Sequence, residues 1–213
     1  MKKLILGLAL FLGFSQVKAQ QIPLYSNYFF TPYVYNPAMS GTDGVTEATI
    51  LHRRQWTGIQ GSPETSALMV NGALNNEAVG WSVYGFSDKT DILSRVGVYG
   101  NYSYTVRLTD DISFSGGIGA GYINQQIDQS GVRARDLGDI FTAVAPNRGT
   151  FDINLGLALK VQDFTLGFAS PQLLSQQIVY SRNANTGDIN YDLIRHFIVS
   201  GQYDFKFAGD KQI

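Results

Sequence analysis

From residue 45 onward the chain alternates apolar and polar side chains, and this alternation limits the possible folds more than any other feature. Between residues 151 and 161 the odd positions are all apolar, whereas the even positions include Asp152, Asn154 and Lys160. The segment 197–207 follows the same period. A period of two over about ten residues indicates strands of a sheet with one apolar and one polar face. The chain is therefore predicted to be all-β.

The connections between the strands differ in length in a regular way. Eight strands are expected, near residues 45–56, 64–73, 78–87, 94–107, 112–126, 151–160, 164–170 and 194–207. Tight turns are expected at 75–76, 109–111, 162–163 and 209–210, and longer links at 57–63, 88–93, 127–150 and 171–193. Short and long connections would then alternate, as they do in outer-membrane proteins with short periplasmic turns and long extracellular loops. This pattern predicts an antiparallel transmembrane outer-membrane β-barrel of at least eight strands.

A soluble sandwich or a lipocalin-like barrel is the alternative, and in it the apolar face would point inward. Alternation alone does not distinguish the two, but the loop lengths and the charged residues on the polar face favour the membrane. The lipid-facing side chains are then expected to include Ile153, Leu155, Leu157, Val199, Tyr203 and Phe205. Arginine should be costly at Leu155 and mild at Asn154. Arg53 and Gln55 would face the lumen, and Arg54 and Trp56 the lipid interface.

The first nineteen residues indicate export. A basic start is followed by an apolar run from Leu4 to Phe14 and by a small residue at Ala19. This run is shorter than the ~20 residues that a membrane-spanning helix needs, which disfavours a membrane anchor. Residues 1–19 are therefore predicted to be a signal peptide that is cleaved after Ala19, and the mature protein is expected in the bacterial outer membrane.

Residues 20–44 form a second unit, which precedes the predicted barrel at 45–213. The stretch 25–41 holds six aromatic residues and two prolines, and it has neither a helical nor a strand period. Exposing so much apolar surface to water would be unfavourable. Pro32 and Pro37 cannot donate hydrogen bonds to a sheet. We therefore expect this N-terminal segment to plug the periplasmic mouth of the barrel.

Composition and motifs argue against several other functions. The net charge is −1 and there is no cysteine, which disfavours nucleic-acid binding and thiol chemistry. The glycines of 115–121 lie within an alternating strand, where they allow close approach of other groups rather than phosphate binding. His52 and His196 have no accompanying nucleophile motif, and Asp128, Asp136 and Asp139 do not have the spacing of a calcium loop. No catalytic residue, metal or cofactor is expected.

Several short motifs together resemble one family. They are Asn36-Pro37-Ala38 followed by Gly41; Arg53, Gln55 and Trp56; Gly61 and Pro63; Asp136 and Asp139 in a long loop; and Arg195-His196 before the last strand. In this order they resemble the PorP/SprF family of outer-membrane proteins associated with the type IX secretion system. The resemblance covers the whole predicted mature chain, although His52 stands where the family has an aromatic residue.

The resemblance implies a non-enzymatic partner protein that assists the export and cell-surface anchoring of secreted adhesins or other type IX substrates. It also implies contact with the secretion machinery and a link to gliding motility. Family members contain more strands, so we expect the barrel of this chain to be incomplete, with its first and eighth strands poorly paired. A general diffusion porin is the alternative, because porins also have a polar lumen, and a lipid-modifying hydrolase is a third possibility without a supporting motif.

Overall fold

The computed structural model describes residues 28–42, 44–74, 78–128, 147–181 and 189–205. The predicted signal peptide, the expected turns at 75–76 and 209–210, and Asp136 and Asp139 lie outside these residues. Among the described residues, no helix is long and apolar enough to cross a membrane.

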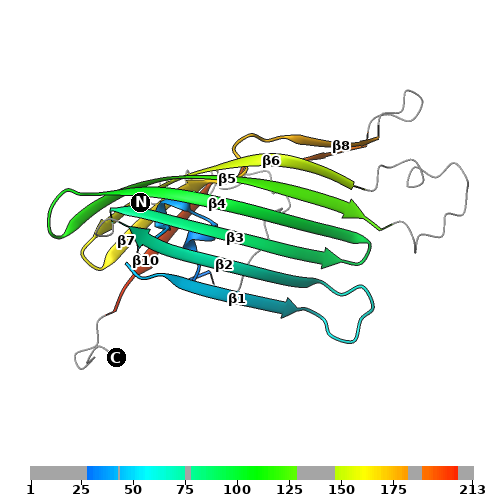
Figure 1. The fold of residues 1–213 in the computed structure, drawn as a ribbon, viewed down its shortest axis with the longest axis horizontal. Coiled ribbons are helices and arrows are strands. Elements are labelled where there is room, and N and C mark those ends of the chain that lie inside the picture. Colours follow the sequence, from blue (N-terminus) through cyan, green and yellow to red (C-terminus); the bar gives the residue numbers. More distant parts are fainter. Residues whose placement is uncertain (1–27, 43, 75–77, 129–146, 182–188, 206–213) are drawn as a thin grey trace, which may run out of the picture.

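The molecule is built around one antiparallel sheet of eight strands, and each of the eight expected strands is present (Figure 1). The strands are β1 (Glu47–Arg54), β2 (Glu64–Leu74), β3 (Val79–Thr90), β4 (Leu93–Arg107), β5 (Ile112–Ile127), β6 (Asn147–Val161), β7 (Phe164–Ser170) and β10 (Ile198–Tyr203). Neighbours in the sheet follow the chain order from β1 to β7, and β10 pairs with β7. Contacts are therefore mostly between strands consecutive in sequence.

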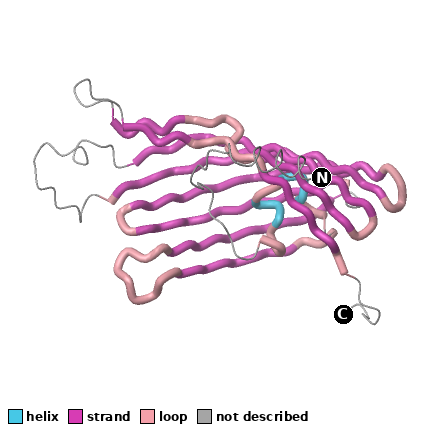
Figure 2. The backbone as a smooth tube through the Cα atoms, turned by 180° about the vertical axis from the view of Figure 1, so that it is seen from behind, coloured by secondary structure: helices cyan, strands magenta, loops and turns pink. Residues whose placement is uncertain are grey.

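The sheet curls into a half-barrel, which its described strands do not close (Figures 1 and 2). In the described part of the chain, β1 pairs only with β2 and β10 pairs only with β7. The expectation that the first and eighth strands are not joined to each other is confirmed.

The two faces of the sheet have opposite chemistry. Large apolar side chains lie exposed on the convex face, among them Ile50, of which 83% is exposed. The concave face carries polar side chains such as Asp152, of which 2% is exposed. The expected outward residues Leu155 and Val199 are exposed. This is the reverse of the arrangement in a soluble barrel, in which the apolar face is enclosed.

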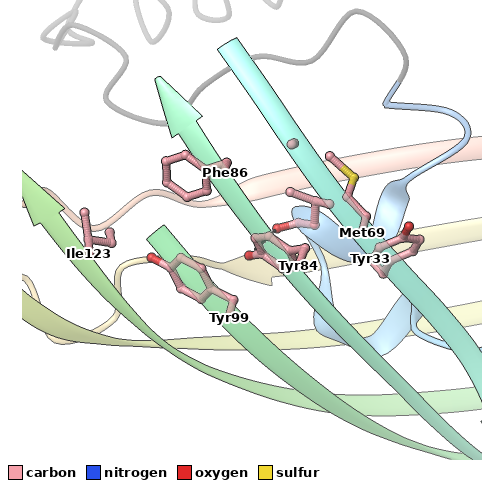
Figure 3. Packing of buried hydrophobic residues seen from close by; sticks show 8 residues of the cluster. Tyr33, Met69, Tyr84, Phe86, Tyr99 and Ile123 are labelled. Carbon is pink, nitrogen blue, oxygen red and sulfur yellow. Dashed lines mark hydrogen bonds between the residues drawn. The ribbon is translucent and has the colours of Figure 1, made fainter. Parts of the chain in front are cut away.

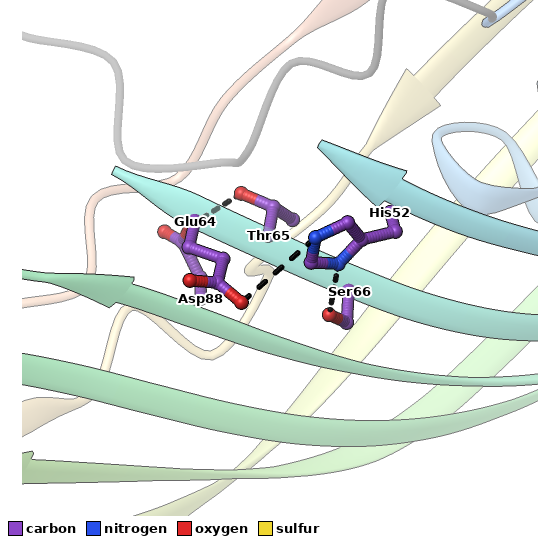
Figure 4. A network of polar contacts seen from close by, with 5 residues as sticks. All are labelled: His52, Glu64, Thr65, Ser66 and Asp88. Atoms are coloured by element: carbon purple, nitrogen blue, oxygen red, sulfur yellow. Dashed lines mark hydrogen bonds and ion pairs between the residues drawn. The ribbon is translucent and has the colours of Figure 1, made fainter. Parts of the chain in front are cut away.

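The apolar band of the convex face ends in polar side chains where β1 and β2 approach their connecting loop. There the Nδ1 atom of His52 lies 3.0 Å from the Ser66 hydroxyl, and its Nε2 atom lies 3.9 Å from Glu64 (Figure 4). Thr65, which points to the other face, donates to Asp88 over 2.6 Å. His52 is thus part of an exposed polar rim.

The prediction that 88–93 forms a long link is wrong. β3 continues to Thr90 and β4 begins at Leu93, so only Asp91 and Ile92 form the turn. Asp91 adopts a φ of 51°, a left-handed conformation that aspartate tolerates, and its amide donates to the Gly61 carbonyl over 2.9 Å. The polar residues before the turn pair within the strand, although their composition is typical of a loop.

The link expected at 171–193 contains two strands that the sequence pattern did not reveal. β8 (Gln177–Ser181) and β9 (Ile189–Asp192) form a separate antiparallel pair, which lies beside β6 (Figure 1). The last strand of the main sheet is correspondingly shorter than the predicted 194–207. Residues before it bond to this link instead, because the His196 amide donates to the Pro171 carbonyl over 3.4 Å.

Candidate functional site

The N-terminal segment (residues 28–42 in the structure) lies on the concave face of the half-barrel (Figure 2). It folds into two short 3-10 turns, η1 (Pro32–Val34) and η2 (Pro37–Met39). Proline suits the first position of such a turn because its φ is fixed and its missing N–H is not needed there. Asn36 caps η2, since its side chain accepts a hydrogen bond from the Ala38 amide over 3.0 Å.

Glycines of four strands form the floor beneath this segment. A methyl group at Gly117 would lie 2.6 Å from the Ala38 Cα, and one at Gly156 would lie 2.9 Å from the ring of Pro37. Gly80 and Gly167 leave the same kind of room, for Ser40 and Asn36 respectively. Real side-chain carbons essentially never come so close. We call this surface the glycine floor; it is defined by Gly80, Gly117, Gly156 and Gly167.

Polar side chains around the glycine floor hold the main chain of the segment. Asn101 donates to the Tyr33 carbonyl over 2.9 Å, and Tyr84 donates to the Val34 carbonyl over 3.2 Å. Ser103 donates to the Ser40 carbonyl over 2.8 Å, and Asn71 accepts from the Gly41 amide over 2.8 Å. All of these partners lie on strands, so the curled sheet positions them.

Two further side-chain contacts hold the segment on the sheet. The Asn36 amide donates to the Leu157 carbonyl of β6 over 3.1 Å, and the hydroxyls of Ser40 and Ser82 lie 3.0 Å apart. Asn36, Pro37, Ala38 and Ser40 are all buried. The Asn-Pro-Ala motif is therefore the part of the segment that reaches the glycine floor.

An aromatic cluster packs beside the first turn of the segment. Tyr33 and Val34 lie against the inward side chains of β2, β3 and β4, including Met69 and Tyr84 (Figure 3). The rings of Tyr84 and Tyr99 stack with centroids 5.1 Å apart. This cluster is the main apolar core on the concave face and fixes the segment at its N-terminal half.

Further along the concave face, toward the long loops, the polar lining contains charged groups. The Tyr99 hydroxyl donates to the carboxylate of Asp152 over 3.1 Å. The guanidinium of Arg95 lies 5.6 Å from the centre of the Phe86 ring, within the range of a cation–π interaction. These groups hold one another in place. They do not include a nucleophile that is paired with a general base.

Two cavities flank the N-terminal segment. One, of about 600 Å³, lies toward the short turns and is lined by charged residues that include Arg107, Asp110 and Lys160. The other, of about 580 Å³, lies between the segment and β10 and is lined largely by apolar groups such as Tyr35 and Phe197. Phe29, Pro32 and Met39 contribute to the walls of both cavities. The segment therefore does not fill the concave face completely.

The second predicted motif builds the loop between β1 and β2. Arg53 faces the concave side of β1, as the alternation of burial along the strand requires. The Gln55 amide donates to the Pro63 carbonyl over 2.9 Å, and Gly61 packs closely against Asp91. Trp56 has a φ of 52° and is exposed. These residues shape the loop rim and lie apart from the glycine floor.

The third motif fastens the chain before β10. The guanidinium of Arg195 donates to the Leu173 carbonyl through Nε and Nη2, over 3.2 and 2.9 Å. The His196 amide donates to the Pro171 carbonyl over 3.4 Å, and the His196 ring borders the apolar cavity. The structure thus distributes the predicted signature residues over three places and does not gather them into one site.

The described residues contain no group of three or more histidine, cysteine, aspartate or glutamate side chains that could hold a metal. In this structure the arrangement binds the main chain of the N-terminal segment. The sequence predicted close approach at the glycines of 115–121, and Gly117 fulfils it. Gly80, Gly156 and Gly167, and the donors Asn101 and Ser103, were missed, because a glycine or polar residue in one strand does not reveal its neighbour in another.

The sequence matches the family model described as type IX secretion system membrane protein PorP/SprF over residues 17–213. No curated protein and no solved structure matches the chain.

Proposed function

Because the chain belongs to the PorP/SprF family of type IX secretion system membrane proteins, we propose that it is a non-enzymatic outer-membrane partner of that system. In this role it assists the export of secreted adhesins or other substrates and anchors them at the cell surface, which links it to gliding motility. The family description names a secretion system and no enzymatic reaction. One observation carries the proposal: an exposed apolar convex face is combined with a concave face occupied by the chain itself.

The convex face supports contact with membrane lipid. Outward-facing apolar side chains cover β2 to β7, and a polar rim lies at the loop end of β1 and β2. An outward apolar band with polar edges is typical of outer-membrane barrels. Residues 1–19 would direct export and be removed after Ala19, and residues 45–213 would contribute to the barrel.

The connections define two ends with different roles. At one end the turns at 108–111 and 162–163 are short. At the other end the chain between β5 and β6 and the chain between β7 and β10 are long, whereas the turn between β3 and β4 is short. In outer-membrane proteins the long loops face the exterior. We place the substrate on the loops at 127–150 and 171–193, and the periplasmic secretion machinery at the short turns.

The N-terminal segment is the observation that favours an anchor over a porin. The polar concave face is the observation that favours a porin, since water-filled channels have such a lining. However, the segment makes buried hydrogen bonds to the wall through Asn71, Asn101 and Ser103. We therefore propose that residues 20–44 plug the periplasmic mouth and that ion conduction is low.

Two measurements on the full-length protein test this proposal. In a planar bilayer the intact protein should conduct ions poorly, and deletion of residues 21–39 should raise the conductance. In cells, shortening the loops at 127–150 and 171–193 should reduce the amount of adhesin on the surface, whereas deletion of 21–39 should leave binding to those loops intact.

Outer-membrane levels and heat-modifiable migration of each variant serve as controls for folding. High, steady conductance of the intact protein, together with normal adhesin display after loop shortening, would contradict the anchor and support a porin.

A further inference from the structure

The concave face holds the N-terminal segment mainly through main-chain atoms. Asn101, Tyr84 and Ser103 each donate to a carbonyl oxygen of the segment, and Asn71 accepts from one of its amides. Every residue of a polypeptide except proline offers the same carbonyl and amide groups. Such contacts therefore select a main chain that can adopt the same two 3-10 turns rather than one particular sequence.

The glycine floor restricts only the part of a chain that lies directly on it. Pro37, Ala38 and Ser40 are small, and they approach Gly117, Gly156 and Gly80 so closely that no larger floor residue would fit. An incoming chain would need a short run of small residues or proline at this point. Its neighbouring residues would meet open cavities instead.

One buried acceptor in this surface has no donor among the described residues. Asn101 is 6% exposed; its amide nitrogen binds the segment at Tyr33 and also the Ser82 hydroxyl, but its Oδ1 atom has no hydrogen-bond partner. A buried acceptor without a partner costs roughly 1–3 kcal/mol. The segment thus satisfies this surface incompletely, and another polypeptide with a suitably placed amide would satisfy it better.

The two cavities leave room for a second polypeptide to enter the concave face beside the N-terminal segment. They lie on either side of the segment, at about 600 and 580 Å³, and share Phe29, Pro32 and Met39 as walls. The larger one is polar and opens toward the short turns, whereas the other is apolar and lies beside β10. An incoming chain can therefore contact the groove before the segment has left it.

We propose that the concave groove is a binding site for a polypeptide segment folded into short turns, that residues 28–42 occupy it in the resting protein, and that a secreted chain displaces them. The partner carries small residues or proline for the glycine floor and a large apolar side chain for the cavity beside β10. This inference rests on the proposed function, which supplies the secreted chain. It adds a second contact to the one on the long loops.

The first experiment uses a fluorescent synthetic peptide with the sequence of residues 28–42. A variant that lacks 28–42 should bind the peptide saturably, and the intact protein should bind it at least about tenfold more weakly, because the tethered segment competes at high effective concentration. Adding Gly117→Ala to the deletion variant should abolish binding, whereas Gly116→Ala should not, since the space at Gly116 is open. A scrambled peptide is the negative control.

The second experiment locks the segment in place. The chain contains no cysteine, and the hydroxyls of Ser40 and Ser82 are 3.0 Å apart, so Ser40→Cys combined with Ser82→Cys should form a disulfide. The oxidised protein should bind no peptide and should display less adhesin on cells, and reduction should restore both. Ser82→Cys alone is the matched control.

The outcomes separate this inference from the proposed function. Normal adhesin display by the locked protein would overturn the displacement and leave the loop-based anchor in place. Absence of peptide binding to a deletion variant that keeps its heat-modifiable migration would overturn the binding site itself. Loss of display after loop shortening tests the anchor alone.

Discussion

Gly116 and Gly117 are neighbours in β5 that face opposite sides of the sheet. A methyl group at Gly117 would lie 2.6 Å from the Ala38 Cα, whereas one at Gly116 would contact nothing within 4 Å. Gly117→Ala should therefore lower the free energy of unfolding by ~1–3 kcal/mol, the usual cost of an overpacked site. Urea titration of the purified protein measures this. An equal effect of Gly116→Ala would show that alanine destabilises the strand itself and not the packing of the N-terminal segment on the glycine floor.

Asn36 has two separable roles in holding the N-terminal segment on the sheet. Its oxygen caps η2 at the Ala38 amide, and its nitrogen donates to the Leu157 carbonyl. Asn36→Ala removes both and should cost about 0.5–2 kcal/mol for the cap alone. Asn36→Asp keeps the cap and loses the second bond, so its effect should be intermediate. Protease cleavage near residue 36 should increase in the order wild type, Asn36→Asp, Asn36→Ala; the same rate in all three would contradict these roles.

At the scale of elements, β6 presents Leu155 outward and Asn154 inward. In lipid, Leu155→Arg near the middle of the strand should cost roughly 2–4 kcal/mol, measured as a loss of folded protein in liposomes at increasing urea. Arginine at Asn154 is not expected to be mild, because Asn154 is buried and accepts from the Gln172 amide over 3.1 Å.

Gln202→Arg is the better control for this strand test. Gln202 faces inward on β10 and donates to Asp204 over 2.9 Å, a bond that arginine can keep. Gln202→Arg should therefore lower the free energy of unfolding clearly less than Leu155→Arg does. Equal tolerance of arginine at both positions would mean that the convex face does not contact lipid.

At the scale of the whole molecule, the apolar side chains on the outer, convex face of the sheet predict where the protein is found in the cell. The protein should fractionate with the outer membrane, migrate differently before and after heating, and begin at Gln20 when its intact mass is measured. Each result has the same physical reason, namely that export removes the leader and lipid then covers the convex face. Recovery in the soluble periplasmic fraction would contradict the architecture.

The sequence by itself determined the class of fold, the eight strands of the main sheet and the family, because alternation and turn residues are local signals. It also predicted that the N-terminal segment is buried, since so many aromatic residues need a partner surface. Tyr33 and Val34 are buried as expected, whereas Tyr28, Phe29 and Phe30 are exposed. Local signals do not show which face of a sheet is enclosed, and this depends on the direction in which the sheet curls. They did not reveal that Asp88 to Thr90 continue β3, because polar residues are common to loops and to the ends of strands. Only the tertiary structure aligned Gly80, Gly117 and Gly156 across β3, β5 and β6 and brought Gly167 of β7 near them, opposite Ala158, since the register between strands is what brings these distant residues together.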